Sequence, residues 1–324
     1  TGATTSLVAS VYTNESIARG DIKSVVINGT LITSIGLRAF KDCTVMESVT
    51  ISDSVTSIGN EVFRQCDALT TVTIPNSVET IGIQAFYHCD DLTTVTLPTN
   101  DSFTSIGDGA FGECSALTTV TIPDSVTSIG ETAFYRCSAL QSMTIPDSVT
   151  SIARYAFFRC SALQSVTIGD SVETIGNQAF RYCSNASFTT ITIPSSVTSL
   201  GTDVFNGCTN LATVYVGSTN TIGITDGTSQ TVSGKTGLTV YYIEKMIVIT
   251  KTDDSVVNIQ TDGTTPMVAS VYIDESIVAG DIKSVALGSL IPSIGASAFQ
   301  NCTNMDSVTF TGTSTVESIG NLAF

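Results

Sequence analysis

The sequence is poor in several residue types, and this scarcity excludes whole classes of function. It has no tryptophan, one histidine, and only 13 Lys and Arg against 29 Asp and Glu, so 324 residues carry a formal net charge of −16. A surface this acidic repels a phosphate backbone, which excludes nucleic acid as a partner. A Ser-His-Asp or Cys-His device would have to use His88, whose neighbours in the sequence indicate an ordinary surface position.

Long apolar runs are also missing. Runs such as 246–249 are far shorter than the roughly 20 residues of a membrane helix, so no membrane insertion of this segment is expected. The N-terminus lacks the basic and apolar regions of a signal peptide, which indicates a cytosolic protein, a processed chain or a fragment. No Cys-x-x-Cys pair occurs, so no zinc site is predicted.

What the sequence has in abundance is internal repetition. Phenylalanine recurs every 23 or 25 residues from Phe40 to Phe205, and a cysteine follows each one three residues later. The spacing of Leu69, Val72 and Ile74, repeated in each unit, predicts a short strand with one buried face. A turn then ends the strand, a second apolar pair returns the chain along another wall, and a short helical segment carries the phenylalanine. Each unit is therefore expected to be one coil of a solenoid.

The repeated string is Ser-Ile-Gly-x-x-Ala-Phe-x-x-Cys-x-x-Leu-x-x-Val-Thr-Ile-Pro-x-Ser-Val, and it covers residues 31–217 and 290–324. It resembles the BspA-like, or Treponema-type, leucine-rich repeat family. The resemblance implies an α/β, strand-dominated leucine-rich-repeat solenoid, with a parallel β-sheet of short strands and coils of 23–25 residues with short helical turns. It also implies a secreted or surface-displayed adhesion protein with no catalytic residues in the motif, and it leaves the partner open.

A second, longer repetition divides the chain. Residues 8–27 recur as 268–287 without the phenylalanine and cysteine, which is typical of an N-terminal cap that shields the first coil. We predict a capped leucine-rich-repeat block over 1–217, a C-cap and small β or linker element over 218–266, and a second N-terminal cap with the first coils of a truncated block over 267–324. The natural protein is expected to be a longer array of such blocks.

All nine cysteines hold the same place in their coils. That position is expected to point inward, where a free thiol behaves as a small apolar group. A ladder of buried thiols is therefore predicted, and disulfides between some neighbouring coils are the alternative. The cysteines are Cys43, Cys66, Cys89, Cys114, Cys137, Cys160, Cys183, Cys208 and Cys302.

A column of variable residues lies just after the motif phenylalanine and is rich in aromatic and arginine side chains. Because the phenylalanine and the cysteine fill inward positions, the two residues between them should face solvent. Exposed aromatic and arginine side chains are typical of binding hot spots. We predict a partner-binding surface here, with mutual packing along the flank as the alternative. Its candidate residues are Tyr87, His88, Tyr135, Arg136, Arg154, Tyr155, Phe158, Arg159, Arg181 and Tyr182.

Two further columns permit other hypotheses. A turn position after the strand is often acidic, and each carboxylate should bond backbone N–H groups two residues on; weak Ca²⁺ binding at Asp124, Asp147 and Asp170 is the alternative. No other metal and no cofactor is predicted. The outward strand positions form Thr-x-Thr columns similar to those of ice-binding proteins, although threonine is also a good strand residue and a curved sheet fits a flat lattice poorly.

Location is indicated by five Asn-x-Ser/Thr sequons, of which two fall in the insertions that lengthen coils to 25 residues. Insertions map to surface loops, where a glycan has room. The sequons favour a secreted glycoprotein, and buried thiols are compatible with an oxidising compartment. The candidate glycosylation sites are Asn14, Asn28, Asn100, Asn185 and Asn301.

These patterns predict a non-enzymatic protein, extracellular or at the cell surface, that binds a protein or glycan of a cell surface or matrix. The alternative is a structural component of an extracellular fibre or coat that self-associates through tandem blocks. Ice binding is a distant third. Catalysis needs several convergent ionisable groups, whereas the repeat supplies rows of Thr, Ser and Asp, so no catalytic residue is predicted.

Overall fold

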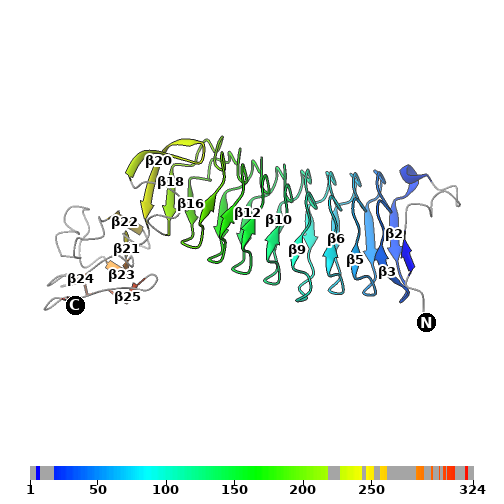
Figure 1. The fold of residues 1–324 in the computed structure, drawn as a ribbon, viewed down its shortest axis with the longest axis horizontal. Coiled ribbons are helices and arrows are strands. Elements are labelled where there is room, and N and C mark those ends of the chain that lie inside the picture. Colours follow the sequence, from blue (N-terminus) through cyan, green and yellow to red (C-terminus); the bar gives the residue numbers. More distant parts are fainter. Residues whose placement is uncertain are drawn as a thin grey trace. The chain divides into compact units, whose positions relative to one another are not determined.

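The computed structural model describes residues 5–7, 18–217, 227–242, 246–251, 256–260, 282–287, 293–294, 299, 302–303, 305–310 and 318–319. The chain forms two compact units, Thr1–Val214 with Ser229–Leu238, and Tyr215–Thr228 with Thr239–Phe324. The first unit is a stack of coils (Figure 1). Each coil has two strand sides and one side made of turns, so the expected strand-dominated solenoid is confirmed.

The first side of each coil, here called the Thr wall, carries the Thr-Val-Thr strands. Neighbouring strands run parallel and in register, so that Ser142, Met143 and Thr144 lie beside Ser165, Val166 and Thr167. The strands are β2 (Ser24–Ile27), β4 (Ser48–Ile51), β6 (Thr71–Thr73), β8 (Thr94–Thr96), β10 (Thr119–Val120), β12 (Ser142–Ile145), β14 (Ser165–Ile168), β16 (Thr190–Ile193) and β18 (Thr213–Val216). In β6 and β8 the middle valine is buried and both threonines are exposed, so the predicted hydroxyl columns face outward.

The second side, the Ser-Ile wall, is formed by shorter parallel strands. They are β1 (Thr5–Leu7), β3 (Ile32–Ile35), β5 (Ser57–Ile58), β7 (Thr80–Ile81), β9 (Ser105–Ile106), β11 (Ser128–Ile129), β13 (Ser151–Ile152), β15 (Thr174–Ile175) and β17 (Ser199–Leu200). Ile129 aligns with Ile106 of the preceding coil and Ile152 of the following one. These isoleucines are almost completely buried, so this wall closes the core as expected.

The third side, here called the turn flank, consists of hydrogen-bonded turns where a short helix was expected. In the coil 128–150, Thr132 and Arg136 both have left-handed backbone conformations, with φ of 57° and 55°. The backbone N–H groups of Thr132, Phe134 and Arg136 therefore donate to carbonyls of the next coil, at 3.1, 2.8 and 2.7 Å. Among the described residues the one helix is the 3₁₀ helix η1 (Arg19–Asp21). Within the described ranges no helix is long and apolar enough to cross a bilayer.

This conformation predicts that a substitution to glycine stabilises the chain. Thr132 is β-branched and left-handed, whereas the coil before it has Gly109 at the same place, with φ of 60°. A left-handed L-residue costs roughly 1–2 kcal/mol and the entropy of glycine about 0.5–1 kcal/mol. We expect Thr132→Gly to raise the free energy of unfolding by about 0.5–1 kcal/mol in urea titrations. Thr144→Gly in β12 should lower it instead, and a loss of stability in Thr132→Gly would contradict this backbone assignment.

The core holds a continuous ladder of phenylalanine rings. The rings run from Phe40 to Phe205, one per coil, with neighbouring centroids 5.1–6.3 Å apart and planes within 17°. Beside it, the cysteines from Cys43 to Cys208 are buried and form no disulfide, which confirms the predicted thiol ladder in this unit. The Cys137 thiol donates to the Phe111 carbonyl of the preceding coil at 3.1 Å, and the other thiols from Cys66 onward make equivalent bonds.

The C-terminal end of the first unit is covered by a hairpin of β19 (Gly227–Val232) and β20 (Lys235–Tyr242). Its turn residue Ser233 accepts from the N–H of Val204 through Oγ at 2.8 Å and from that of Phe205 through its carbonyl at 3.3 Å, and it donates to the Gly201 carbonyl. Ser233 thus makes bonds to the turn flank like those that a further coil makes, and the C-cap over 218–266 stays a prediction.

The second unit repeats part of this arrangement. Its described strands are β21 (Met246–Lys251), β22 (Val256–Gln260), β23 (Ile282–Leu287), β24 (Ser293–Ile294), β25 (Ser307–Phe310) and β26 (Ser318–Ile319). Strand β23 pairs in parallel with β25, with Ser284 beside Ser307, just as Ser24 of β2 lies beside Ser48 of β4. The two copies of the predicted N-terminal cap therefore pair with their first coils in the same way, although 8–17 and 268–281 lie outside the described residues.

Candidate functional site

Basic side chains of the first unit gather on the turn flank. Residues 18–217 contain nine of them, of which all except Arg19 and Lys23 stand between the cysteine of a coil and its preceding glycine, or Ala153 at the same place. The seven on the flank are Arg38, Lys41, Arg64, Arg136, Arg154, Arg159 and Arg181. An acidic chain thus presents most of its positive charge on one side, where backbone bonds between coils hold the turns in place.

Four rings of the predicted aromatic column form one connected cluster on this flank. Tyr135 and Phe158 stack with ring centroids 5.2 Å apart and planes 11° apart. Tyr155 and Tyr182 each meet Phe158 edge-on, at 5.4 and 5.6 Å. These half-buried rings pack on one another along the solenoid, which is the alternative that the sequence left open.

Guanidinium groups cover the ring faces that remain. Arg154 lies 4.4 Å from the Tyr155 centroid and donates to its hydroxyl at 2.8 Å. Arg159 lies 5.6 Å from Phe158 and 5.2 Å from Tyr182. Arg136 lies 5.2 Å from Tyr135, and Arg181 lies 4.8 Å from Tyr182. Cation–π contacts of this kind hold a guanidinium in one orientation, so the rings form a platform for the arginines.

The arginines on these rings determine the charge at the surface of the cluster. Aromatic rings are negative on their faces and positive at their edges, and here neighbouring rings and guanidinium groups contact the faces. Arg136 is paired with Glu113 at 3.5 Å. Within the described part of the chain, no carboxylate lies within ion-pair distance of Arg159, whose side chain is exposed. The cluster over coils 128–198 is therefore electropositive.

His88, at the acidic end of the same flank, has more carboxylate neighbours than an ordinary surface position would give it. Its Nδ1 lies 3.3 Å from Asp90 and 3.7 Å from Asp67, and its Nε2 lies 3.8 Å from Glu113. Burial, followed by the Glu113 carboxylate, raises the pKa of the adjacent Tyr87 to about 12. Tyr87 and His88 thus belong to an acidic region, while the other eight predicted site residues form the basic cluster.

A groove runs along the flank between these two regions. One side is formed by Arg136, Arg159 and Tyr182, and Asp90 and Glu113 lie at its acidic end. The other side is a column of serines, Ser115, Ser138, Ser161 and Ser184. The groove does not follow from the repeat pattern alone, although each of these serines directly follows the motif cysteine.

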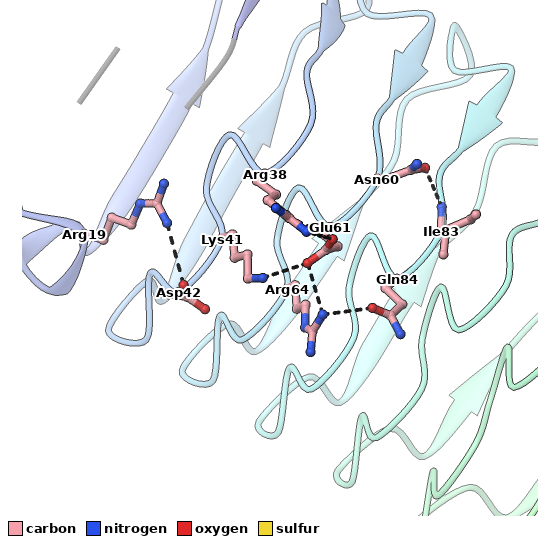
Figure 2. A network of polar contacts seen from close by, with 9 residues as sticks. All are labelled: Arg19, Arg38, Lys41, Asp42, Asn60, Glu61, Arg64, Ile83 and Gln84. Atoms are coloured by element: carbon pink, nitrogen blue, oxygen red, sulfur yellow. Dashed lines mark hydrogen bonds and ion pairs between the residues drawn. The ribbon is translucent and has the colours of Figure 1, made fainter. Parts of the chain in front are cut away.

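A second cluster, around Glu61, was also missed. Figure 2 shows this carboxylate between Arg38, Lys41 and Arg64, at 2.6, 2.7 and 3.0 Å. The three cations hold the pKa of Glu61 at about 2, with the bond from Arg38 as the largest cause, and the side chain is 13% exposed. Aligning the coils by position would have revealed this cluster, because its members stand two and five residues after the glycine.

The Glu61 cluster predicts a pH dependence of stability. The pKa is depressed, so the stabilisation is complete above the ordinary carboxyl value and is lost as pH falls from about 4.5 to about 2. We expect Glu61→Gln to destabilise the chain by about 1–2 kcal/mol at pH 7, after discounting for the solvent around Arg38. The difference from wild type should vanish near pH 2 in thermal melts. An unchanged difference at low pH would show that the carboxylate charge is not its source.

In the acidic turn column, Asp147 accepts a hydrogen bond from the next coil, where a bond within its own coil was expected. Asp147 Oδ1 accepts from the backbone N–H of Asp170 in the next coil at 2.8 Å, so the prediction of a bond two residues on is wrong for Asp147. Among the described residues no group of His, Cys, Asp and Glu is arranged to hold a metal ion, so Ca²⁺ at Asp124, Asp147 and Asp170 gains no support.

The sequons in the two insertions have structural roles. Asn100 Nδ2 donates to the carbonyls of Asn76 and Val78, both at 2.8 Å, and its Oδ1 accepts from two backbone N–H groups. Asn185 Nδ2 donates to Ala162 at 3.1 Å. A glycan would remove one donor from Asn100, which argues against its modification. Asn28 is exposed and stays a candidate, and Asn14 and Asn301 lie outside the described residues.

Comparison with known proteins identifies the family. The family described as BspA type leucine rich repeat region matches residues 14–141, 104–226 and 277–324. The chain is similar to a leucine-rich repeat protein of Bacteroides ovatus, at 26% identity over 93% of this chain and 75% of that one, with a TM-score of 0.58. It also resembles a leucine-rich cell surface protein of Faecalibacterium prausnitzii (27% identity, 94% and 67% covered, TM-score 0.49) and a leucine-rich repeat protein of T. pallidum (28%, 59% and 78%, 0.46). No curated protein matches the sequence. The chain belongs to the BspA-type leucine-rich repeat family.

Proposed function

We propose that this chain is a non-enzymatic binding protein that recognises a protein or glycan through its turn flank. The observation that carries the proposal is the gathering of arginine and aromatic side chains on one side of an acidic solenoid. Such residues dominate binding hot spots, and a stack of coils offers an extended surface for them. Pre-oriented guanidinium groups favour binding because less conformational freedom is lost when the partner arrives.

We place this binding outside the cell or at its surface. The family resemblance implies secreted or surface-displayed proteins, and the buried thiols are compatible with that location. Burial raises the pKa of Cys66 and Cys160 well above the ordinary value, so these thiols resist oxidation without a reducing compartment. Free cysteines are thus compatible with an extracellular protein.

A second candidate is a structural component of an extracellular coat or fibre. It is favoured by the equivalent pairing of β2 with β4 and of β23 with β25, which points to tandem blocks. Ice binding through the Thr wall is a more distant candidate, and a purified chain without thermal hysteresis would remove it.

Two measurements on the full chain separate the first two candidates. Binding of the labelled chain to immobilised extracellular-matrix proteins should saturate, with a dissociation constant that salt raises. Sedimentation velocity over a range of protein concentrations should show a monomer. Growth of the sedimentation coefficient with concentration, together with non-saturating binding, would instead support the structural role.

A further inference from the structure

The groove on the turn flank is acidic at one end, where Asp90 and Glu113 line it, and basic in its middle, where Arg136 and Arg159 line it. We propose that it binds an extended peptide segment of a partner protein, with carboxylates over Arg136 and Arg159 and a basic side chain toward Asp90 and Glu113. This inference rests on the proposed function and specifies the chemistry of the partner.

The basic part of the groove is suited to bind carboxylates. The Arg159 guanidinium lies against both Phe158 and Tyr182, and no carboxylate among the described residues neutralises it. Arg136 has one carboxylate at 3.5 Å, which leaves most of its five donors free. Arginine binds carboxylates through paired, charge-assisted hydrogen bonds, and these two stand at the same position of consecutive coils.

The serine side of the groove suits a peptide backbone. Ser115, Ser138 and Ser161 donate their hydroxyls to carbonyls of the preceding coil, at 3.3, 3.2 and 3.4 Å. A serine hydroxyl that donates one hydrogen bond can still accept another through its oxygen lone pairs. The column therefore offers hydrogen-bond acceptors to the N–H groups of an extended chain.

The length and charge pattern of the groove favour a short peptide over a polyanion. Its lining extends from coil 80–104 to coil 174–198. Four inter-coil steps of about 4.8 Å span roughly 20 Å, which is about six residues of extended chain. A uniformly anionic polysaccharide of this length would meet Asp90 and Glu113 as well as the net charge of −16. A segment with separated charges avoids that repulsion.

The test uses fluorescent synthetic peptides and the full chain. Two probes carry an Asp block followed by a Lys block, or the reverse order, and a third alternates Asp and Lys at the same composition. Fluorescence anisotropy should show that at least one block peptide binds, that salt weakens it, and that the alternating peptide binds at least about tenfold more weakly. Heparin serves as the polyanion probe and should not compete.

Matched variants locate the site. Arg136→Gln with Arg159→Gln should weaken block-peptide binding at least about tenfold. Glutamine is tolerated there, because Gln65 holds the equivalent left-handed position with φ of 59°. Arg64→Gln, which removes a flank charge already bonded to Glu61, should change affinity less than about twofold.

Several outcomes would overturn the inference. They are equal losses in both sets of variants, equal binding of the alternating peptide, competition by heparin, and no peptide binding at all. If matrix binding depends on Arg136 and Arg159 while no peptide binds, the peptide inference fails and the proposed function stands. If the block peptides bind in this Arg-dependent way but the chain binds no matrix protein, the proposed matrix partner fails and the groove assignment stands.

Discussion

Phe157→Ala is expected to lower the free energy of unfolding by about 3–5 kcal/mol, the usual cost of removing a fully buried ring. Phe157 lies in the phenylalanine ladder between Phe134 and Phe180, with centroids at 5.4 and 5.2 Å. Its loss would open a cavity between three coils and weaken both coil interfaces, on which solenoid stability depends. Urea unfolding followed by circular dichroism measures the effect, since the chain has no tryptophan.

The adjacent residue provides a matched control. Phe158 is half-buried on the turn flank, where it contacts Tyr135, Tyr155 and Tyr182. Phe158→Ala should cost about 1 kcal/mol, because solvent can fill the space that the ring leaves. If the two substitutions were equally destabilising, the assignment of one ring to the core and the other to the surface would be wrong.

The thiols are expected to differ sharply in reactivity between the native and unfolded chain. The cysteines from Cys43 to Cys208 are buried and form no disulfide, and burial raises the pKa of Cys89, Cys137 and Cys183 as well. Ellman's reagent should modify them at least about a thousandfold more slowly than in denaturant, because they react only when coils open. Cys302 is less buried and should react first.

Protein purified without reductant is the required control for that experiment. Its denatured chain should yield all nine thiols. A lower yield that reductant restores would show disulfides between coils, the alternative that the sequence left open, and rapid native labelling would show that the ladder is not buried.

The core was predictable because each core position recurs at one place in the repeat. Phenylalanine, cysteine and the alternating strand residues each recur at one place, so their burial follows from the period alone, and stacking of Phe134 on Phe157 follows from coil stacking. The left-handed turns were not predictable. Their positions hold Thr132, Arg136 and Tyr155, which have no intrinsic preference for that conformation, and hydrogen bonds to the next coil impose it.

The candidate site was predictable in composition but not in arrangement. The sequence placed Tyr135, Arg136, Phe158 and Arg159 on one flank, which the structure brings together. Which ring faces are covered depends on side-chain directions that spacing does not determine. The pairing of Glu61 with three cations depends likewise on long side chains that reach between coils.

Recognition through the turn flank is tested most directly by comparing two faces of the same chain in matrix binding. Arg136→Gln with Arg159→Gln alters the turn flank, and Thr144→Gln with Thr167→Gln alters the exposed Thr wall by the same number of residues. We expect the arginine pair to lower affinity for immobilised matrix proteins at least about tenfold and the threonine pair to leave it within about twofold. If the threonine pair lost binding and the arginine pair kept it, recognition would lie on the Thr wall, and the proposed role of the turn flank would be wrong.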